Sequence, residues 1–407
     1  MELKKGYKGY KSFDYLVPDE DYKVIELAEE GNAFTGNTFI ELTPEQEALA
    51  KKVAENNIFI SLHDHPNLFP KNIGDTFEYA RENRIFTAYR ALAESLWDCI
   101  FDNLQDGCCV ITSKHGWKWM DVLSDIGMRM SDIAHQDFLI KCENVNDIYR
   151  AKAEGKIAWV PVLESAMVLE NEVDRVDILH GFGIRHMGIT YSESNALGSG
   201  LKENGDGGLT YFGRQVVERM NKVGMAIDCS HVGPKTTLDV IEASKKPIIM
   251  SHTGARKLWN SKRLMQDEVL KTCADKGGVI GIEAAPHTTI TENNRTHSIE
   301  SYMEHFEYIK DLVGIDHVAF GPDTLYGDHV GLHHTFAKHL SIKQAFVKLS
   351  KDGSSEFPEV PYVKYLENPT ECSHNILRWL VKHNYSEGDI AKVMGGNALR
   401  VLKEIWQ

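Results

Sequence analysis

The sequence predicts an α/β protein whose core is a (β/α)8 TIM-like barrel with N- and C-terminal additions. Short, apolar, β-branched runs alternate with amphipathic helical stretches from about residue 57 onward. Runs that are apolar on both faces are typical of parallel strands covered by helices, and the eight runs found here fit a closed barrel. No Gly-rich phosphate turn of the GxGxxG or Walker type follows the first run, which argues against an open doubly wound sheet.

The barrel strands are expected at these eight runs, and helices between most of them. In chain order the runs read NIFISLH, GCCVITS, IAWVPVLE, HMGITY, GMAIDCSH, PIIMSH, GGVIGIEA and DHVAFGPD. The intervening stretches LTYFGRQVVERMNKVG and PKTTLDVIEAS have apolar residues at helical spacing. WKWMDVLSDIGMRM has the same amphipathic pattern, so its Trp and Met residues are expected in the core or in a subunit contact.

Nothing in the sequence marks an internal domain boundary. There is no low-complexity tract, Pro/Ser linker or short repeat, so residues 1–407 are expected to form a single domain. Residues 1–56 are predicted to be an N-terminal extension, 57–340 the barrel, and 341–407 a C-terminal helical addition. The last segment contains YSEGDIAKVMGGNALRVLKEIW, which has the pattern of two short helices.

The charge and composition of the sequence exclude several kinds of binding partner and location. The formal net charge is −14, whereas a nucleic-acid partner requires a cationic surface, so none is expected. The sequence contains neither the apolar core of a signal peptide nor the roughly 20 apolar residues that span a bilayer, which predicts a cytoplasmic protein without a membrane partner. The 7 cysteines are odd in number and follow no CxxC spacing, so reduced, mostly buried thiols are expected.

Metal-capable side chains end five of the predicted strands. They are His63, His65, Glu164, His231, His252 and Asp323. The carboxyl ends of all strands of a parallel barrel open onto one face, so these residues are expected to meet there. A single histidine at a strand end is more often a hydrogen-bonded structural group. Here, however, five strands on one rim end on polar residues. A buried polar side chain without a partner costs about 1–3 kcal/mol, so a bound metal explains this pattern better. Imidazoles and carboxylates suit zinc best, and also manganese, iron, cobalt or nickel.

The first strand carries two of these ligands. Alternation along a strand puts His63 and His65 on one face, which predicts a chelating pair. Asp64 points to the other face and is expected to orient a ligand or to cap a backbone group.

Several longer motifs resemble the membrane (renal) dipeptidase family of the amidohydrolase superfamily. They are VPVLESA, GIRHMGITYSESNALGSG, GLTYFGRQVVERMNKVGMAIDCSHVG, PIIMSHTGAR, HVAFGPD and YSEGDIAKVMGGNALRVL, in the order and approximate spacing of the family over roughly residues 57 to 405. The resemblance implies a metal-dependent hydrolase barrel with two zinc ions per chain.

The resemblance also implies the roles of the strand-end residues. Glu164 and a hydroxide would bridge the two metals. His63 and His65 would complete one metal site, and His231 and His252 the other. Asp323 would lie beside the first metal and the hydroxide.

On the substrate side, Arg263 in NSKRLMQDEVL corresponds to an arginine that holds the carboxylate of the substrate. Asn195, at the start of the polar loop 195–208, is expected to contact substrate as well.

Two positions depart from the family. The usual His-x-Asp of the first strand is His63-x-His65 here, which removes an anionic ligand. Tyr191 replaces a histidine that binds the scissile carbonyl, although a phenol can still donate a hydrogen bond to an oxyanion.

These features predict a zinc-dependent dipeptidase, in which Asp323 moves the proton from the attacking water to the leaving amine. One alternative is an amidohydrolase acting on another small amide, lactam, ester or carbamoyl substrate; a less favoured one is a non-catalytic metal-binding relative. The segment 324–336 is expected to form part of the loop over the site, where it could close on substrate or form an oligomer contact. Relatives are often homodimers, so a homodimer is possible.

Overall fold

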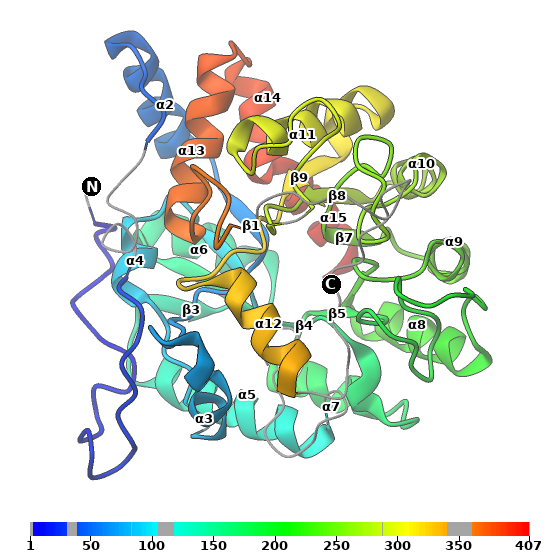
Figure 1. Cartoon of the computed structure of the whole chain (residues 1–407), viewed down its shortest axis with the longest axis horizontal. Coiled ribbons are helices and arrows are strands. Elements are labelled where there is room, and N and C mark those ends of the chain that lie inside the picture. Colours follow the sequence, from blue (N-terminus) through cyan, green and yellow to red (C-terminus); the bar gives the residue numbers. More distant parts are fainter. Residues whose placement is uncertain are drawn as a thin grey trace.

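The structure is a computed structural model that describes residues 3–30, 39–82, 84–104, 118–286, 288–339 and 360–406. Within these residues, one sheet of parallel strands forms a nearly closed barrel, and helices surround it (Figure 1). The predicted (β/α)8 fold is therefore confirmed.

Eight strands make up the wall of the barrel. In spatial order they are β1 (Ile60–Asp64), β2 (Cys99–Asn103), β4 (Ile157–Leu163), β5 (His186–Gly188), β6 (Ala226–Asp228), β7 (Ile249–Thr253), β8 (Val279–Ile282) and β9 (Val318–Phe320). A short strand, β3 (Leu139–Lys141), pairs with β4 outside this path. Backbone hydrogen bonds join the chain after β9 to the end of β1. The Asp323 N–H donates to His63 O at 3.0 Å, and the His65 N–H donates to Thr324 O at 2.9 Å.

The second strand is not where the sequence placed it. The run GCCVITS, residues 107–113, lies outside the described residues, and the second barrel strand is β2. Its sequence, CIFDN, ends on two polar residues that nevertheless are buried. Asp102 accepts a hydrogen bond from the Trp159 indole at 2.7 Å, and Asn103 donates one to Glu164 at 2.6 Å. These two polar residues interrupt the apolar pattern, so the sequence alone did not indicate a strand here. In the fold, their side chains form hydrogen bonds with residues of other elements.

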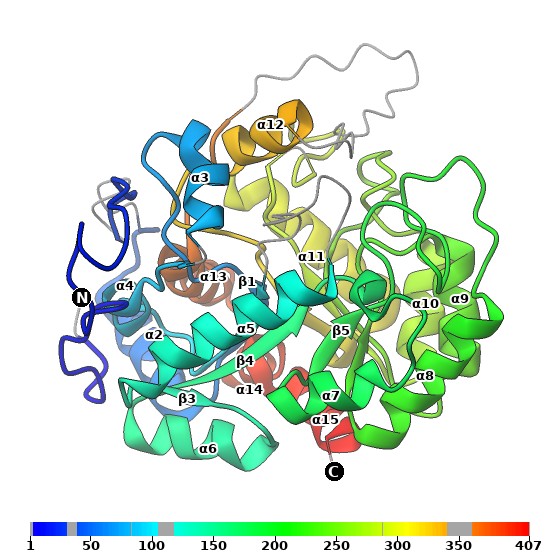
Figure 2. The same cartoon turned by 90° about the horizontal axis from the view of Figure 1, so that it is seen from below.

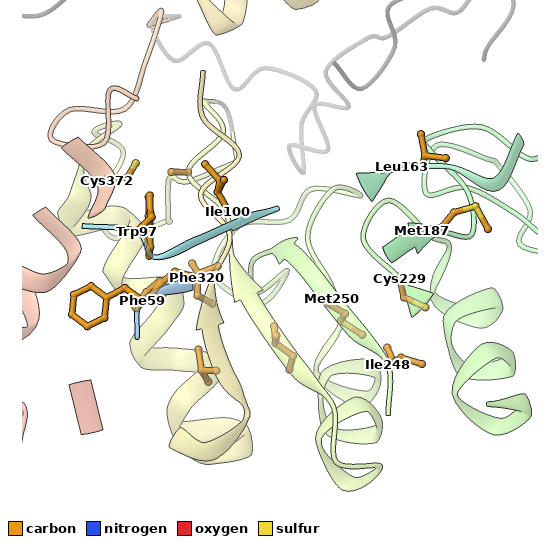
Figure 3. Packing of buried hydrophobic residues seen from close by; sticks show 14 of the residues in the cluster. Phe59, Trp97, Ile100, Leu163, Met187, Cys229, Ile248, Met250, Phe320 and Cys372 are labelled. Carbon is orange, nitrogen blue, oxygen red and sulfur yellow. The ribbon is translucent and has the colours of Figure 1, made fainter. Parts of the chain in front are cut away.

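Helices follow most strands and cover the outside of the barrel. They are α5 (Trp119–Ala134), α6 (Val145–Glu154), α7 (Arg175–Phe182), α8 (Tyr211–Val223), α9 (Pro234–Ala243), α10 (Asp267–Asp275) and α11 (Ile299–Val313). The predicted α5, α8 and α9 are confirmed. In α8, Thr210 caps the N-terminus through the Gly213 N–H, and Gly224 ends the helix with φ 78°. Apolar side chains of the strands and helices pack in the layer between them, part of which is seen in Figure 3.

The remaining helices lie in the two predicted additions and in connections on the barrel. They are α2 (Pro44–Asn56), α3 (Thr76–Arg81), α4 (Tyr89–Glu94), α12 (His329–His339), α13 (Pro369–Lys382), α14 (Glu387–Ala391) and α15 (Asn397–Ile405). The two short helices predicted near the end are α14 and α15. The predicted loop 324–336 is partly wrong, because α12 begins inside it. Asp328 starts this helix by accepting a hydrogen bond from the Gly331 N–H at 2.8 Å.

One end of the barrel is closed by α15, which leaves the other end for the site (Figure 2). Its apolar residues form one cluster with the inward-facing residues of the strands. Asn397 donates to the carbonyl of Val318, at the start of β9, at 2.7 Å. Trp406 donates to Arg185 O, just before β5, at 3.2 Å. These contacts are with the amino ends of strands, so the open face lies at the carboxyl ends.

No helix in the described ranges has the length and apolar character needed to cross a membrane. The five cysteines that the structure describes are buried free thiols, whereas Cys108 and Cys109 lie outside the described residues.

A glycine at the end of β5 fixes the position of the strand end that carries Glu164. A Cβ on Gly188 would lie 2.0 Å from the backbone oxygen of Glu164. We expect Gly188→Ala to lower the free energy of unfolding by about 1–3 kcal/mol, as overpacking does in other cores. The matched control is Gly127→Ala in α5, where a Cβ would meet nothing within 4 Å and alanine favours the helix. Urea unfolding of both variants checks this; equal stabilities would contradict the account.

Candidate metal centre and active site

The six predicted ligands meet at the carboxyl ends of the barrel strands. His63 lies on β1 with His65 just beyond it, and His252 lies on β7. Glu164, His231 and Asp323 follow β4, β6 and β9. All six residues are at most 8% exposed, so each polar group has been removed from water. Convergence of these groups from five strands is the central feature of the site.

Two groups of ligand atoms overlap at His252. One group consists of His63, His252 and Asp323, the other of Glu164, His231 and His252, and the ligand atoms of each group lie within 4.8 Å of one another. Glu164 Oε1 lies 3.2 Å from the Nε2 atoms of His231 and His252. It lies 3.5 Å from His63 Nε2. This carboxylate oxygen is thus shared by three imidazoles from different strands.

Asp323 lies on the other side of the cluster. Its Oδ1 atom is 3.2 Å from His65 Nε2 and 3.6 Å from His63 Nε2. The backbone φ angles of Asp323 and His231 are 58° and 61°, in the left-handed region. Such a conformation costs on the order of 1–3 kcal/mol for a residue other than glycine, and it clusters at functional sites. Both of these backbone conformations occur at residues of the cluster.

A buried hydrogen-bond chain sets the tautomer of His252. Ser251 Oγ donates to Asp228 Oδ2 at 2.5 Å and therefore accepts from His252 Nδ1 at 2.7 Å. With the proton on Nδ1, the Nε2 lone pair of His252 faces the cluster. This arrangement is common behind metal-binding histidines.

The protonation of the site suits metal binding. Burial lowers the pKa of His63 to about 3 and those of His231 and His252 well below the usual value, so all three rings are neutral. Burial and the neighbouring charge of Asp323 raise the pKa of Glu164 above its ordinary range. His63 Nε2 is buried and has no hydrogen-bond partner among the described residues. Neutral imidazoles, an orphan lone pair and two buried carboxyls fit a centre that binds divalent metal ions.

Comparison with known proteins identifies the family. The sequence matches the model of the membrane dipeptidase family, peptidase family M19, over residues 122–357. The chain belongs to the membrane dipeptidase family. This family consists of metal-dependent hydrolases, and the resemblance seen in the sequence motifs is confirmed.

The chain is similar in sequence to two fungal proteins, dipeptidase tcpJ of Claviceps purpurea and dipeptidase aclJ of Aspergillus oryzae. The chain is 24% identical to the first over 69% of its length, and 25% identical to the second over 66%. The match spans only 58% and 57% of these two proteins.

Solved structures share the fold. An amidohydrolase from Pseudomonas aeruginosa is 26% identical, with a TM-score of 0.69 over 88% of this chain and 99% of that chain. A metallopeptidase from Rhodobacter sphaeroides, liganded with a phosphinate mimic of the dipeptide L-Ala-D-Ala, is 17% identical. Its TM-score is 0.62 over 86% of this chain and 100% of that chain.

Two predicted substrate residues lie beside the cluster in this member of the membrane dipeptidase family. The ring of Tyr191 stacks on that of His231, with 4.2 Å between centroids. Arg263 Nη1 donates to the backbone oxygen of His252 at 3.1 Å. Asn195 does not join them, because its side chain donates to Ile189 O and accepts from the Leu197 N–H, which organises its own loop. Its predicted contact with substrate stays a prediction.

Asp64 faces away from the cluster. Its carboxyl group accepts hydrogen bonds from the backbone N–H and hydroxyl of Thr324 at 2.9 and 2.8 Å, and from Ser61 Oγ at 2.5 Å. It thereby ties the end of β1 to the residue that follows Asp323.

Asn103 is a site residue that sequence reasoning missed. Its amide nitrogen donates to Glu164 Oε2 at 2.6 Å, opposite the oxygen that faces the imidazoles. We expect Asn103→Ala to weaken zinc binding by about 10–100-fold, as loss of such a supporting hydrogen bond does elsewhere. Zinc titration with a competing chelator measures the change. The control Asn146→Ala alters an exposed asparagine in α6; equal zinc affinities for N103A and N146A would contradict the role of Asn103.

Proposed function

We propose that the protein is a zinc-dependent dipeptidase whose two metal ions are bridged by Glu164. The observation that carries the proposal is the position of Glu164 Oε1 among three imidazole nitrogens. Asp323 Oδ1 lies beside one of them, that of His63, and beside His65. His63 and His65 would hold one metal, and His231 and His252 the other. The names of the fungal relatives and the dipeptide mimic in the Rhodobacter sphaeroides structure support this choice of substrate.

The bound metals would activate a water molecule and polarise the scissile carbonyl. Asp323 accepts the proton of the attacking water and delivers it to the leaving amine. Tyr191, stacked on His231, donates a hydrogen bond to the carbonyl oxygen as negative charge develops there. Arg263 binds the terminal carboxylate of the dipeptide. Glu164 is a poor proton carrier in this scheme, because both of its oxygens are engaged.

The experiment is an assay of L,L- and L,D-dipeptides with the full chain, before and after zinc is added. Zinc-dependent release of two amino acids is the expected result. Turnover of neutral amides, lactams, esters or carbamoyl compounds without dipeptide cleavage would instead support the second candidate, a different small-amide hydrolase. The ion pair that Arg263 makes with Glu283 favours this candidate, since it occupies part of the carboxylate-binding group.

A cytoplasmic location, a possible homodimer and the non-catalytic alternative stay predictions from the sequence. Bound zinc with no turnover of any amide or ester would favour a non-catalytic metal-binding protein.

A further inference from the structure

Next to the metal cluster lies an ion pair of which the proposed mechanism uses only one member, Arg263. Arg263 Nη2 is 2.5 Å from Glu283 Oε2, and the two side chains are 13% and 1% exposed. Arg263 also donates to the backbone oxygen of His252, a proposed metal ligand. The pair therefore lies next to a residue of the proposed metal centre.

The position of Glu283 is fixed by the barrel. It directly follows β8, and its N–H donates to Thr253 O, at the end of β7, at 3.0 Å. The next residue, Ala284, donates to Pro322 O at 2.7 Å. The backbone of Glu283 is thus held between β7 and β9, and its side chain is buried beside Arg263. Burial raises the pKa of this carboxyl group to about 7, while Arg263 acts in the opposite direction.

The pair changes what Arg263 can offer to a substrate. A guanidinium group binds a carboxylate best through two parallel N–H groups and with an uncompensated positive charge. In this protein one nitrogen donates to His252 O, and another faces the charge of Glu283. A substrate carboxylate would therefore bind to a guanidinium group whose positive charge is already compensated by Glu283. It would also lie close to the carboxyl group of Glu283, and like charges repel.

We infer that Glu283 is a specificity-determining residue, which lowers the affinity of the site for leaving groups with a free carboxylate relative to neutral ones such as C-terminal amides. The inference rests on the proposed function, because Arg263 selects among substrates only if they bind at the metal cluster. It distinguishes this chain from a dipeptidase in which the arginine is free to hold the carboxylate.

The test compares L-Ala-L-Ala with its C-terminal amide on the zinc-loaded full chain. The readout is the ratio of kcat/KM for the dipeptide to kcat/KM for the amide. We expect this ratio to rise about tenfold in Glu283→Gln, since the charge of Arg263 is then released for the carboxylate. Glu283→Asp retains the negative charge and is expected to stay near the wild-type ratio. An unchanged ratio in E283Q, or equal losses on both substrates, would overturn the inference, because a merely structural role affects both substrates alike.

A matched control is Glu292→Gln. Glu292 lies on the same connection after β8, but its side chain is 63% exposed and pairs with Arg295 at 2.8 Å. The ratio is expected to be unchanged in this variant. If E283Q does not fold, Glu283→Ala is measured in its place, with the same expected rise of the ratio and the same overturning result.

Failure of the proposed function can be separated from failure of this inference. If neither compound is hydrolysed, the dipeptidase proposal fails, and binding is measured by calorimetry instead. The probes are a phosphinate mimic of Ala-Ala and its C-terminal amide. Tighter binding of the free acid by E283Q than by wild type, by about tenfold, supports the role of Glu283. Equal affinities in the two proteins, or no binding to either, would overturn it.

Discussion

Replacement of Glu164 by glutamine is expected to remove metal binding and activity together. Zinc content should fall from near two ions per chain to less than one, and dipeptide turnover should fall by more than about 10³-fold. The reason is geometric and electrostatic. Glu164 Oε1 is the oxygen that the imidazoles of His231 and His252 share at 3.2 Å, and the amide offers no negative charge to hold two dications.

Elemental analysis and a zinc-dependent activity assay measure the two effects. Thermal unfolding adds a readout independent of turnover, because zinc should raise the melting temperature of wild type much more than that of E164Q. Without metal, E164Q should be at least as stable as wild type at neutral pH. Burial raises the pKa of Glu164, so the ionised carboxylate opposes folding at pH values above its unfolded pKa, and glutamine removes that penalty. Glu170→Gln, at a half-exposed residue beyond β4, serves as the control. Two tightly bound zinc ions in E164Q would contradict the assignment.

Asp323→Asn is expected to reduce dipeptide turnover by about 10²–10⁴-fold, the contribution typical of a positioned proton carrier. Burial alone would raise the pKa of Asp323, but the hydrogen bond with His65 lowers it well below the ordinary range. The group is therefore anionic and can accept a proton, which asparagine cannot. Zinc content should fall less than in E164Q, because the shared oxygen of Glu164 remains.

Steady-state kinetics with metal analysis of the same preparations separates the two roles of Asp323. Asp328→Asn is a close control, since Asp328 caps α12 through the Gly331 N–H and asparagine caps a helix equally well. Wild-type turnover in D323N would exclude Asp323 as the proton carrier. Complete loss of zinc in D323N would show that its main role is as a ligand.

The barrel and the convergence of the candidate ligands could be predicted because the signals for both are local. Apolar runs that end on His63, Glu164 or His252 show the strand and its polar end within a few residues. The (β/α)8 topology then brings these ends together whatever lies between them. The helices α8 and α9 could be predicted just as directly, since the spacing of their apolar residues lies within the segments themselves.

The parts that escaped prediction depend on distant partners. Strand β2 ends on Asp102 and Asn103, and their burial makes sense only with Trp159 and Glu164 in place. Glu283 had a local signal, because it is a polar residue next to the last position of the apolar run GGVIGIEA, but its partner Arg263 is visible only in the fold. The side chain of Asn195 organises its own loop, which also depends on the fold, and its predicted contact with substrate stays a prediction.

In the proposed centre, Glu164 would be shared by two metal ions at the carboxyl ends of the barrel strands. A crystal structure of the zinc-soaked protein, with anomalous differences recorded at the zinc edge, tests it most directly. The predicted result is two strong peaks, one near His63 and His65 and one near His231 and His252, with Glu164 between them. A single peak away from Glu164, or no peak after zinc has been supplied, would contradict the binuclear site.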